Sequence, residues 1–238
     1  MAKIKNLLIK SLAVAFVLLI GIGVVIYTNK YNNRKITDIQ LTVNAPENRL
    51  MLIDSMLLKS INNEANGLVG SNLKGLNHKP IVEKLSIMEA VDTVYISCGV
   101  SGILMIEVIQ KTPVAKVLLS QSEVRYLTDN GELIKSKYYG EELISINGNT
   151  CKNTHQLVSF IEKDKFFKAI TQSITIDKNN RHLLATNYTK QAVDVGEIIN
   201  LKEKSDNLRY FFEAIGDNID KYKEFNLNYK NQIVAIKK

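Results

Sequence analysis

The chain has 238 residues, which is long enough to bury one hydrophobic core or two smaller ones without disulfide support. It carries 31 Lys and Arg residues against 24 Asp and Glu residues, a formal charge of +7. Residues 1–35 hold six of the basic residues and no acidic residue, so residues 36–238 have 25 basic and 24 acidic residues, a net charge of +1. A nucleic-acid-binding protein needs its basic patch in the folded part of the chain, and we exclude that class.

An apolar segment, LLIKSLAVAFVLLIGIGVVIY, occupies residues 7–27 and is interrupted only by Lys10 and Ser11. With a rise of about 1.5 Å per residue, this segment forms a helix roughly 31 Å long, enough to cross a hydrocarbon core of about 30 Å. Lys10 lies about one turn from the helix start, where its long side chain can reach the lipid headgroups. We predict a transmembrane helix at 7–27, a tail at 1–6 and a linker at 28–35.

A cleaved signal peptide is the alternative interpretation of this segment. Signal peptides have an apolar region of about 7–15 residues, followed by small residues at the cleavage site. The segment here is longer, and it continues into TNKY with no Ala-x-Ala pattern. We therefore expect a retained anchor. Three basic residues precede or enter it and three follow it, so charge does not set the orientation. A short tail before a large body favours a cytoplasmic N-terminus.

Residues 36–112 are expected to form a small domain with helices on one face of a three-stranded sheet, because the apolar residues alternate in some segments and recur at helical spacing in others. Its inward-facing row is expected to be Leu104, Ile106 and Val108. The expected elements are a strand (36–43), a helix (50–61), a polar loop (62–77), a helix from Pro80 to 88, and a hairpin (93–98 and 104–109).

Pro113 marks the boundary to a second, β-rich domain at 113–238. Its expected strands are 115–119, 123–128, 133–134, 170–176, 182–186, 192–195 and a closing hairpin at 223–229 and 232–236. One helix is expected from about Thr154 and another around the stripe of Leu208, Phe211, Phe212 and Ile215, ended by Gly216. The predicted fold class is therefore α+β, with a single N-terminal transmembrane helix, a small β-α-α-β-β domain and a β-rich domain with a few helices.

No group of residues indicates an active site, a metal site or a cofactor site. Cys151 and His155 have helical spacing, but two ligands are fewer than the three or four that zinc needs. The run of 99–102, GVSG, lacks the residue that a nucleophile elbow places between Ser and the second Gly, and it reads as a hairpin turn. Cys98 and Cys151 are too few for a disulfide scaffold and are interpreted as unpaired or partly buried thiols. The body is therefore expected to work by binding.

Several segments, in their order and spacing, resemble the periplasmic body of the bacterial cell-division family FtsQ/DivIB. They are IVEKLSIMEAVDTVYI (81–96), LMIEVIQKTPVAKV (104–117), YLTDNGELI (126–134), DKFFKAITQSITI (164–176), AVDVG (192–196) and EFNLNYKNQIVAIKK (224–238). The segments at 164–176 and 192–196 resemble Bacteroidetes-type members. The chain departs from the family pattern at Gln110-Lys111, where Glu-Arg is usual, and at Asn226 and Asn228, where Asp and Arg are usual.

The resemblance implies a non-enzymatic scaffold of the divisome, acting during septum formation. It implies an inner-membrane protein with a cytoplasmic N-terminus and a periplasmic body. The first domain would be a POTRA domain that contacts other membrane division proteins. The second would bind the FtsB and FtsL pair through its C-terminal edge strand.

The last strand is where we expect the partner to bind. A chain-terminal strand after a hairpin lies at the edge of a sheet, and its unpaired backbone groups can accept an added strand. The residues expected to take part are Tyr229, Gln232, Ile233, Val234, Ala235 and Ile236. The alternative is a hairpin that only closes the core.

Two other functions stay open at this point. One is a membrane-anchored periplasmic enzyme or sensor with an unrecognised site, which would require a polar cluster in a deep pocket. The other is a POTRA-bearing chaperone or translocation component, which would be expected to have tandem POTRA units or a barrel.

Overall fold

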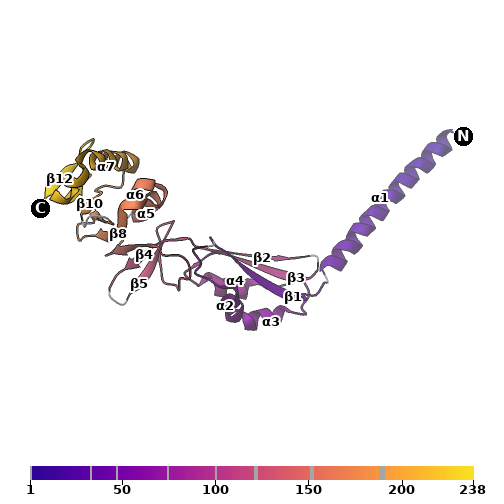
Figure 1. Ribbon diagram of the computed structural model, residues 1–238. Coiled ribbons are helices and arrows are strands. Elements are labelled where there is room, and N and C mark those ends of the chain that lie inside the picture. The colour runs from indigo at the N-terminus through magenta and orange to yellow at the C-terminus, as the bar shows by residue number, and fades with distance from the viewer. Residues whose placement is uncertain are drawn as a thin grey trace. The chain divides into compact units, whose positions relative to one another are not determined.

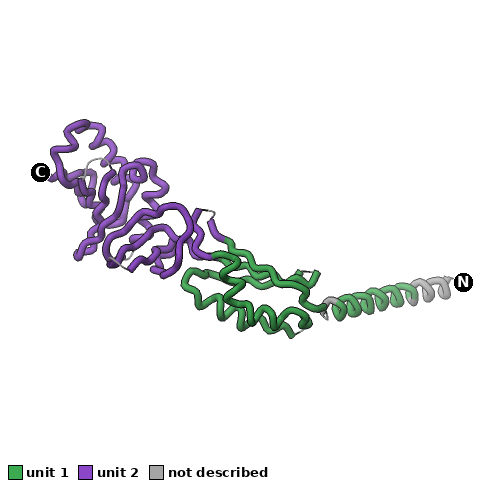
Figure 2. Tube along the Cα trace, turned by 60° about the horizontal axis from the view of Figure 1, so that its bottom comes forward, with its two compact units in different colours: residues 1–44, 53–109 green, residues 45–52, 110–238 purple. Residues whose placement is uncertain are grey.

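The computed structural model describes residues 2–32, 34–46, 48–73, 75–99, 101–120, 123–150, 153–187 and 191–238 (Figure 1). The chain divides into two compact units. Unit 1 comprises Met1–Asn44 and Ile53–Ile109, and unit 2 comprises Ala45–Leu52 and Gln110–Lys238 (Figure 2). The chain is a mixed α/β protein with one apolar N-terminal helix and one large sheet.

The N-terminal helix α1 spans Ala2–Asn32. Among the described residues it is the one helix long and apolar enough to cross a membrane, with a candidate span at Leu12–Lys30 and a mean hydropathy of 2.3. The helix continues past the predicted end at Tyr27, so residues 28–32 of the expected linker are helical. The Thr28 hydroxyl donates to the Val24 carbonyl at 2.9 Å, a bond that holds this hydroxyl within the helix.

The body of unit 1 is a three-stranded sheet in the order β1-β3-β2. Its strands are β1 (Asp38–Asn44), β2 (Val91–Cys98) and β3 (Ile103–Gln110), and its helices are α2 (Asp54–Ser60), α3 (Asn62–Leu68) and α4 (Lys79–Ser86). The strand β1 runs parallel to β3, from the pair Asp38–Ile103 to the pair Asn44–Ile109. The helices lie along one side of this sheet (Figure 1).

The core of unit 1 confirms the predicted inward row. Leu104, Ile106 and Val108 are all buried, and Ile81 and Leu85 of α4 are buried with them. An alternating strand that buries one row of side chains beneath amphipathic helices is what the sequence pattern indicates.

Two predictions about this unit are wrong. The loop expected at 62–77 contains α3, because burial of Ala65 stabilises a helix that the polar composition and Gly67 disfavour. The helix expected at 50–61 begins only at Asp54, because the preceding residues are bonded within unit 2.

The turn between β2 and β3 confirms the interpretation of the GVSG run for its described residues. The Gly99 N–H donates to the Ile103 carbonyl at 2.9 Å, and the Gly102 N–H donates to the Gly99 carbonyl at 3.1 Å. Gly102 has a φ of 87°, and a Cβ there would lie 2.7 Å from the Lys35 carbonyl oxygen. Only glycine fits this position.

Unit 2 contains a nine-stranded sheet in the order β12-β11-β10-β9-β8-β7-β4-β5-β6. Its strands are β4 (Pro113–Leu118), β5 (Val124–Thr128), β6 (Leu133–Ile134), β7 (Ile144–Asn147), β8 (Thr171–Ile176), β9 (His182–Thr186), β10 (Ala192–Asp194), β11 (Tyr222–Asn226) and β12 (Val234–Lys237). Its helices are α5 (Thr154–Lys163), α6 (Lys165–Ile170), α7 (Leu201–Ile215) and the 3-10 helix η1 (Gly216–Lys221).

The core of unit 2 joins the sheet to the three α-helices. Leu157 of α5, Phe167 of α6 and Leu208 of α7 are fully buried in it, and the remaining residues of the predicted stripe on α7 pack against it. Gly216 ends α7 as expected. The strand expected to begin at Ile170 begins one residue later, because α6 occupies the residues before it.

The start of α6 depends on the carboxylate of Asp164. This carboxylate accepts the Phe167 N–H at 3.0 Å and the Ser205 hydroxyl of α7 at 2.8 Å. Burial acts to raise the pKa of Asp164, but these two bonds and the nearby Lys202 ammonium outweigh it and hold the pKa below its ordinary value. One charged side chain thus caps α6 and binds α7 to it.

Residues 45–52, which we call the strap, belong to unit 2 although the chain before and after them belongs to unit 1. The buried side chain of Gln110 binds the strap. Its Oε1 accepts the N–H groups of Met51 and Leu52 at 2.6 and 2.9 Å, and its Nε2 donates to the Arg49 carbonyl at 2.8 Å. The amide thus satisfies three backbone groups of the strap, while the N–H groups of Tyr139 and Glu141 donate to the carbonyls of Leu50 and Asn48.

Side chains of the strap extend this attachment. The Arg49 guanidinium donates to the Pro113 carbonyl at 2.9 Å and forms an ion pair with Glu162 of α5. The Asn48 carbonyl accepts the Tyr138 hydroxyl at 3.2 Å. The strap is thus a structural part of unit 2, rather than part of a helix of unit 1.

The variant Gln110→Leu should lower the free energy of unfolding of the full chain in detergent by about 3 kcal/mol, because it leaves buried N–H and C=O groups of the strap without partners. Urea unfolding measures this loss. The matched variant Gln172→Leu changes an exposed residue of β8 and should shift stability by less than about 0.5 kcal/mol. Equal, small losses for both variants would show that the strap is not held by Gln110.

Candidate partner-binding edge of the large sheet

The strand β12 lies at one edge of the nine-stranded sheet. It pairs antiparallel with β11, where Val234 lies opposite Asn226, Ala235 opposite Phe225 and Ile236 opposite Glu224. The predicted closing hairpin and its edge position are therefore present. A strand in this position has one hydrogen-bonded side and one free side.

The free side of β12 can be identified from one hydrogen bond. The Lys238 N–H donates to the Lys221 carbonyl at 3.0 Å, so the N–H of residue 238 points inward. Successive N–H groups of a strand point to opposite sides of it. A residue whose N–H points away from an antiparallel neighbour also directs its C=O away from that neighbour. The odd-numbered residues of β12 therefore present both backbone groups to the free side. These residues are Ala235 and Lys237.

The side chains of β12 divide between the two faces of the sheet. Ala235 and the preceding Ile233 pack against the helix-covered core. Val234, 41% exposed, and the half-buried Ile236 lie on the opposite face. A strand added at this edge would find an apolar neighbour on each face.

The structure brings together three of the six residues predicted for binding. Val234, Ala235 and Ile236 lie in β12, whereas Gln232 and Ile233 precede the strand. Tyr229 is 56% exposed in the hairpin turn, where its carbonyl accepts the Gln232 N–H at 3.3 Å. Sequence reasoning missed Lys237 as a strand residue, because lysine is uncommon in strands and gives no strand signal.

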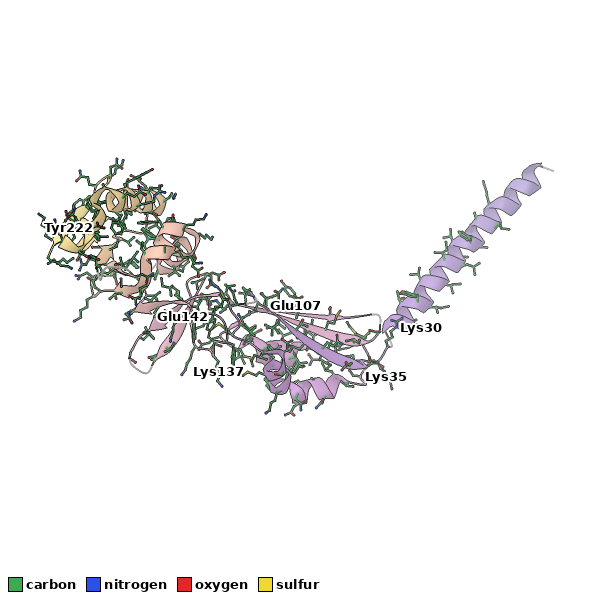
Figure 3. All side chains as sticks on the ribbon, viewed as in Figure 1. Lys30, Lys35, Glu107, Lys137, Glu142 and Tyr222 are labelled. Atoms are coloured by element: carbon green, nitrogen blue, oxygen red, sulfur yellow. The ribbon has the colours of Figure 1, made fainter. Side chains whose placement is uncertain are left out.

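Aromatic side chains support the strand next to β12. Phe225 of β11 is buried, and its ring lies 5.1 Å from that of Phe212, 5.7 Å from that of Phe211 and 5.8 Å from that of Tyr222. Tyr222 is labelled in Figure 3 at the C-terminal part of the sheet. Such ring contacts stabilise the fold by more than the buried area alone accounts for, so β11 is firmly packed beside the edge strand β12.

A buried carboxylate joins the strands behind this edge. Asp194 is 1% exposed, and its carboxylate accepts the Gly196 N–H at 3.0 Å and the Asn226 amide N–H at 3.4 Å. The same carboxylate forms an ion pair with the Arg181 guanidinium at 3.4 Å. Its carbonyl accepts the Leu227 N–H at 2.8 Å. The two strands β10 and β11 are thus bonded by a charged side chain as well as by their backbones.

A small cavity of about 310 Å³ lies between the hairpin turn and the start of α7, lined in part by Lys204, Leu227 and Tyr229. Burial lowers the pKa of Lys204, whose ammonium donates to the carbonyls of Val195 and Glu197. These bonds join α7 to residues 195–197, so Lys204 has a structural role. The lining provides no nucleophile with an adjacent base.

His182, at the start of β9, is a buried histidine. Burial also lowers the pKa of His182, whose Nε2 lies 3.1 Å from the Thr154 hydroxyl, while nearby Asp194 acts to raise it. Within the described ranges there is no cluster of three or more His, Cys, Asp or Glu residues able to hold a metal ion. Cys151 lies outside the described residues, so the structure does not test the expectation that Cys151 and His155 form no zinc site.

Comparison with protein families gives one match. The model of the family "FtsQ/DivIB, C-terminal related" matches residues 112–236, which is more than half of the chain and nearly all of unit 2. Comparison with curated protein sequences gives no match.

The variant Asp194→Ala should lower the free energy of unfolding by about 2–3 kcal/mol, because it leaves the N–H of Gly196 and the amide of Asn226 without their acceptor. Urea unfolding of the full chain in detergent measures the loss. Asp217→Ala, at an exposed residue of η1, is the matched control and should change stability by less than about 0.5 kcal/mol. A loss no larger than that of the control would contradict the role given to Asp194.

Proposed function

Because the chain belongs to the FtsQ/DivIB-related family of cell division proteins, we propose that it is a non-enzymatic scaffold of the division machinery. It binds other single-pass division proteins during septum formation. Members of this family are generally non-enzymatic, and the binding edge of unit 2 offers backbone groups and apolar side chains rather than catalytic ones.

The proposed topology places α1 across the inner membrane, with the tail at 1–6 in the cytoplasm and the folded body in the periplasm. The apolar composition and length of α1 support this proposal, as does the family. The anchor confines the body to a layer next to the membrane, which raises its effective concentration toward membrane-bound partners.

Unit 1 supplies the proposed POTRA-like docking module at 36–112. It has the expected order of a strand, helices and a hairpin, with an additional helix, α3, between the two that were predicted. Its helices cover one face of a three-stranded sheet, which leaves the other face for contacts. The partner-binding domain is proposed at 113–238.

The proposed partners of unit 2 are proteins like FtsB and FtsL, which add a strand to the free side of β12. The observation that carries this proposal is the edge position of β12, with the backbone groups of Ala235 and Lys237 directed away from β11. Strand addition satisfies those groups, and the apolar side chains of Ile233, Val234 and Ile236 flank the incoming strand.

Two proline variants of neighbouring residues test this proposal. Val234→Pro removes an N–H that points to β11 and should lower the free energy of unfolding by about 1–3 kcal/mol. Ala235→Pro removes an N–H on the free side, so it should leave stability within about 0.5 kcal/mol of the parent and weaken partner binding by about tenfold or more.

Urea unfolding and co-purification of the FtsB-like protein from membranes measure the two effects, and each variant is the control for the other. A fully stable Ala235→Pro chain that binds its partner as the parent does would place the interface elsewhere. Loss of stability in both variants would contradict the assignment of the free side.

A further inference from the structure

The small sheet of unit 1 also has two edges, β1 and β2, and the chain treats them differently. An edge strand presents a row of unpaired backbone groups, which proteins commonly cap or cover to prevent uncontrolled pairing. The two edges differ in how their backbone groups are covered, and the less covered edge is available to another chain.

The edge at β1 is closed by side chains and by a neighbouring segment. The Val43 N–H donates to the Asp54 carboxylate at 3.0 Å, and the Ile39 N–H donates to the Asp38 carboxylate at 2.8 Å. Just before the strand, Ile36 exchanges hydrogen bonds with residues 70–71 at 2.8 and 2.9 Å. An incoming strand would have to displace all of these partners.

The edge at β2 differs at its centre, around Val94 and Ile96. The Gly99 N–H donates to the Ile103 carbonyl and so points toward β3. Backbone groups alternate along a strand, so the odd-numbered residues of β2 direct their N–H and C=O groups toward β3 and the even-numbered residues direct theirs away from it. No side chain in the described part of the chain donates to or accepts from the outward groups of Val94 and Ile96. The strand has eight residues, VDTVYISC, with no Lys, Arg or Pro to discourage pairing.

We propose that β2 pairs antiparallel with β2 of a second copy of this chain, joining the two small sheets into one. The register that pairs the outward groups of Val94 with those of Ile96 places Tyr95 on the two-fold axis. In that register Val94 lies opposite Ile96, Thr93 opposite Ser97 and Asp92 opposite Cys98. Each pair of outward residues exchanges two backbone hydrogen bonds, as in any antiparallel ladder.

The side chains of β2 complement their own copies in this register. Apolar Val94 meets apolar Ile96 on the helix side, where both are half-buried in one copy. On the other face, the two Tyr95 rings, each 58% exposed, meet at the axis. Asp92 is the single charge of the strand and faces an uncharged residue, so no like charges oppose each other. This self-complementarity favours a second copy over a foreign strand.

Two further features support pairing between copies. Ile87, at the C-terminal end of the helix α4 that packs on β2, is 80% exposed, an apolar side chain that the single copy leaves in water. The membrane helix proposed for α1 confines copies to one plane, so a short interface can suffice for association. The inference is independent of partner binding at β12.

Disulfide trapping tests the register directly. The native Cys98 and Cys151 are changed to Ser, and a single cysteine is introduced as Tyr95→Cys in the full chain in lipid vesicles. At the axis, the two Cα atoms form a close non-hydrogen-bonded pair about 4.5 Å apart, a separation that a disulfide spans. With diamide as the oxidant, this variant should give roughly tenfold more cross-linked dimer than the control.

The matched control is Thr42→Cys, also exposed, on β1. Thr42 pairs with Glu107, and counting from the Gly99–Ile103 pair places Tyr95 opposite the same Glu107, so both residues lie on one face of the sheet. Equal cross-linking of the two variants would overturn the proposal, because it would reflect random collision.

A second variant tests the backbone contacts. Val94→Pro in the Tyr95→Cys chain removes an outward N–H, so cross-linking should fall to the level of the control while the thermal unfolding midpoint stays unchanged. An unchanged cross-linking yield would overturn the proposal. A fall in the unfolding midpoint would overturn it as well, because that N–H would then belong to the sheet of the single copy.

Discussion

The unsatisfied backbone groups of sheet edges are the constraint on which the interactions of this protein depend. A sheet that does not close on itself has two edges, and each must be capped, kept short or paired. The edge at β1 is capped by Asp38 and Asp54, and the edge at β6 is only two residues long. We propose that the two remaining edges, β2 and β12, pair with other chains. Each unit therefore has one protected edge and one edge suited to strand addition.

The departures from the family pattern have physical explanations in this chain. Gln110 stands where the family has Glu, and its amide both accepts from and donates to the strap, which a carboxylate could not do. Asn226 stands where the family has Asp, and its amide donates to the buried carboxylate of Asp194. A second carboxylate there would repel the first. In both places a neutral amide fits a site that offers both donors and acceptors.

The sequence predicted the elements whose signal is local. The apolar run of α1, the alternation around Ile106, the stripe on α7 and the closing hairpin all agree with the structure. The elements it missed depend on distant residues. The helix α6 needs the Asp164 cap that is bound to α7. The residues before Asp54 stay out of α2 because Gln110, far along the chain, binds the N–H groups of Met51 and Leu52. At the site, the edge position followed from chain order, whereas the free side of β12 required the bond between Lys238 and Lys221.

Amide hydrogen exchange, resolved by residue along β12 in the full chain, tests most directly which backbone groups are open. The account predicts slow exchange at Val234 and Ile236, whose N–H groups point to β11, and fast exchange at Ala235 and Lys237, whose N–H groups point to the free side. Addition of the FtsB-like partner should then slow exchange at Ala235 and Lys237. Protection of Ala235 and Lys237 in the free chain, with rapid exchange at Val234 and Ile236, would contradict the account.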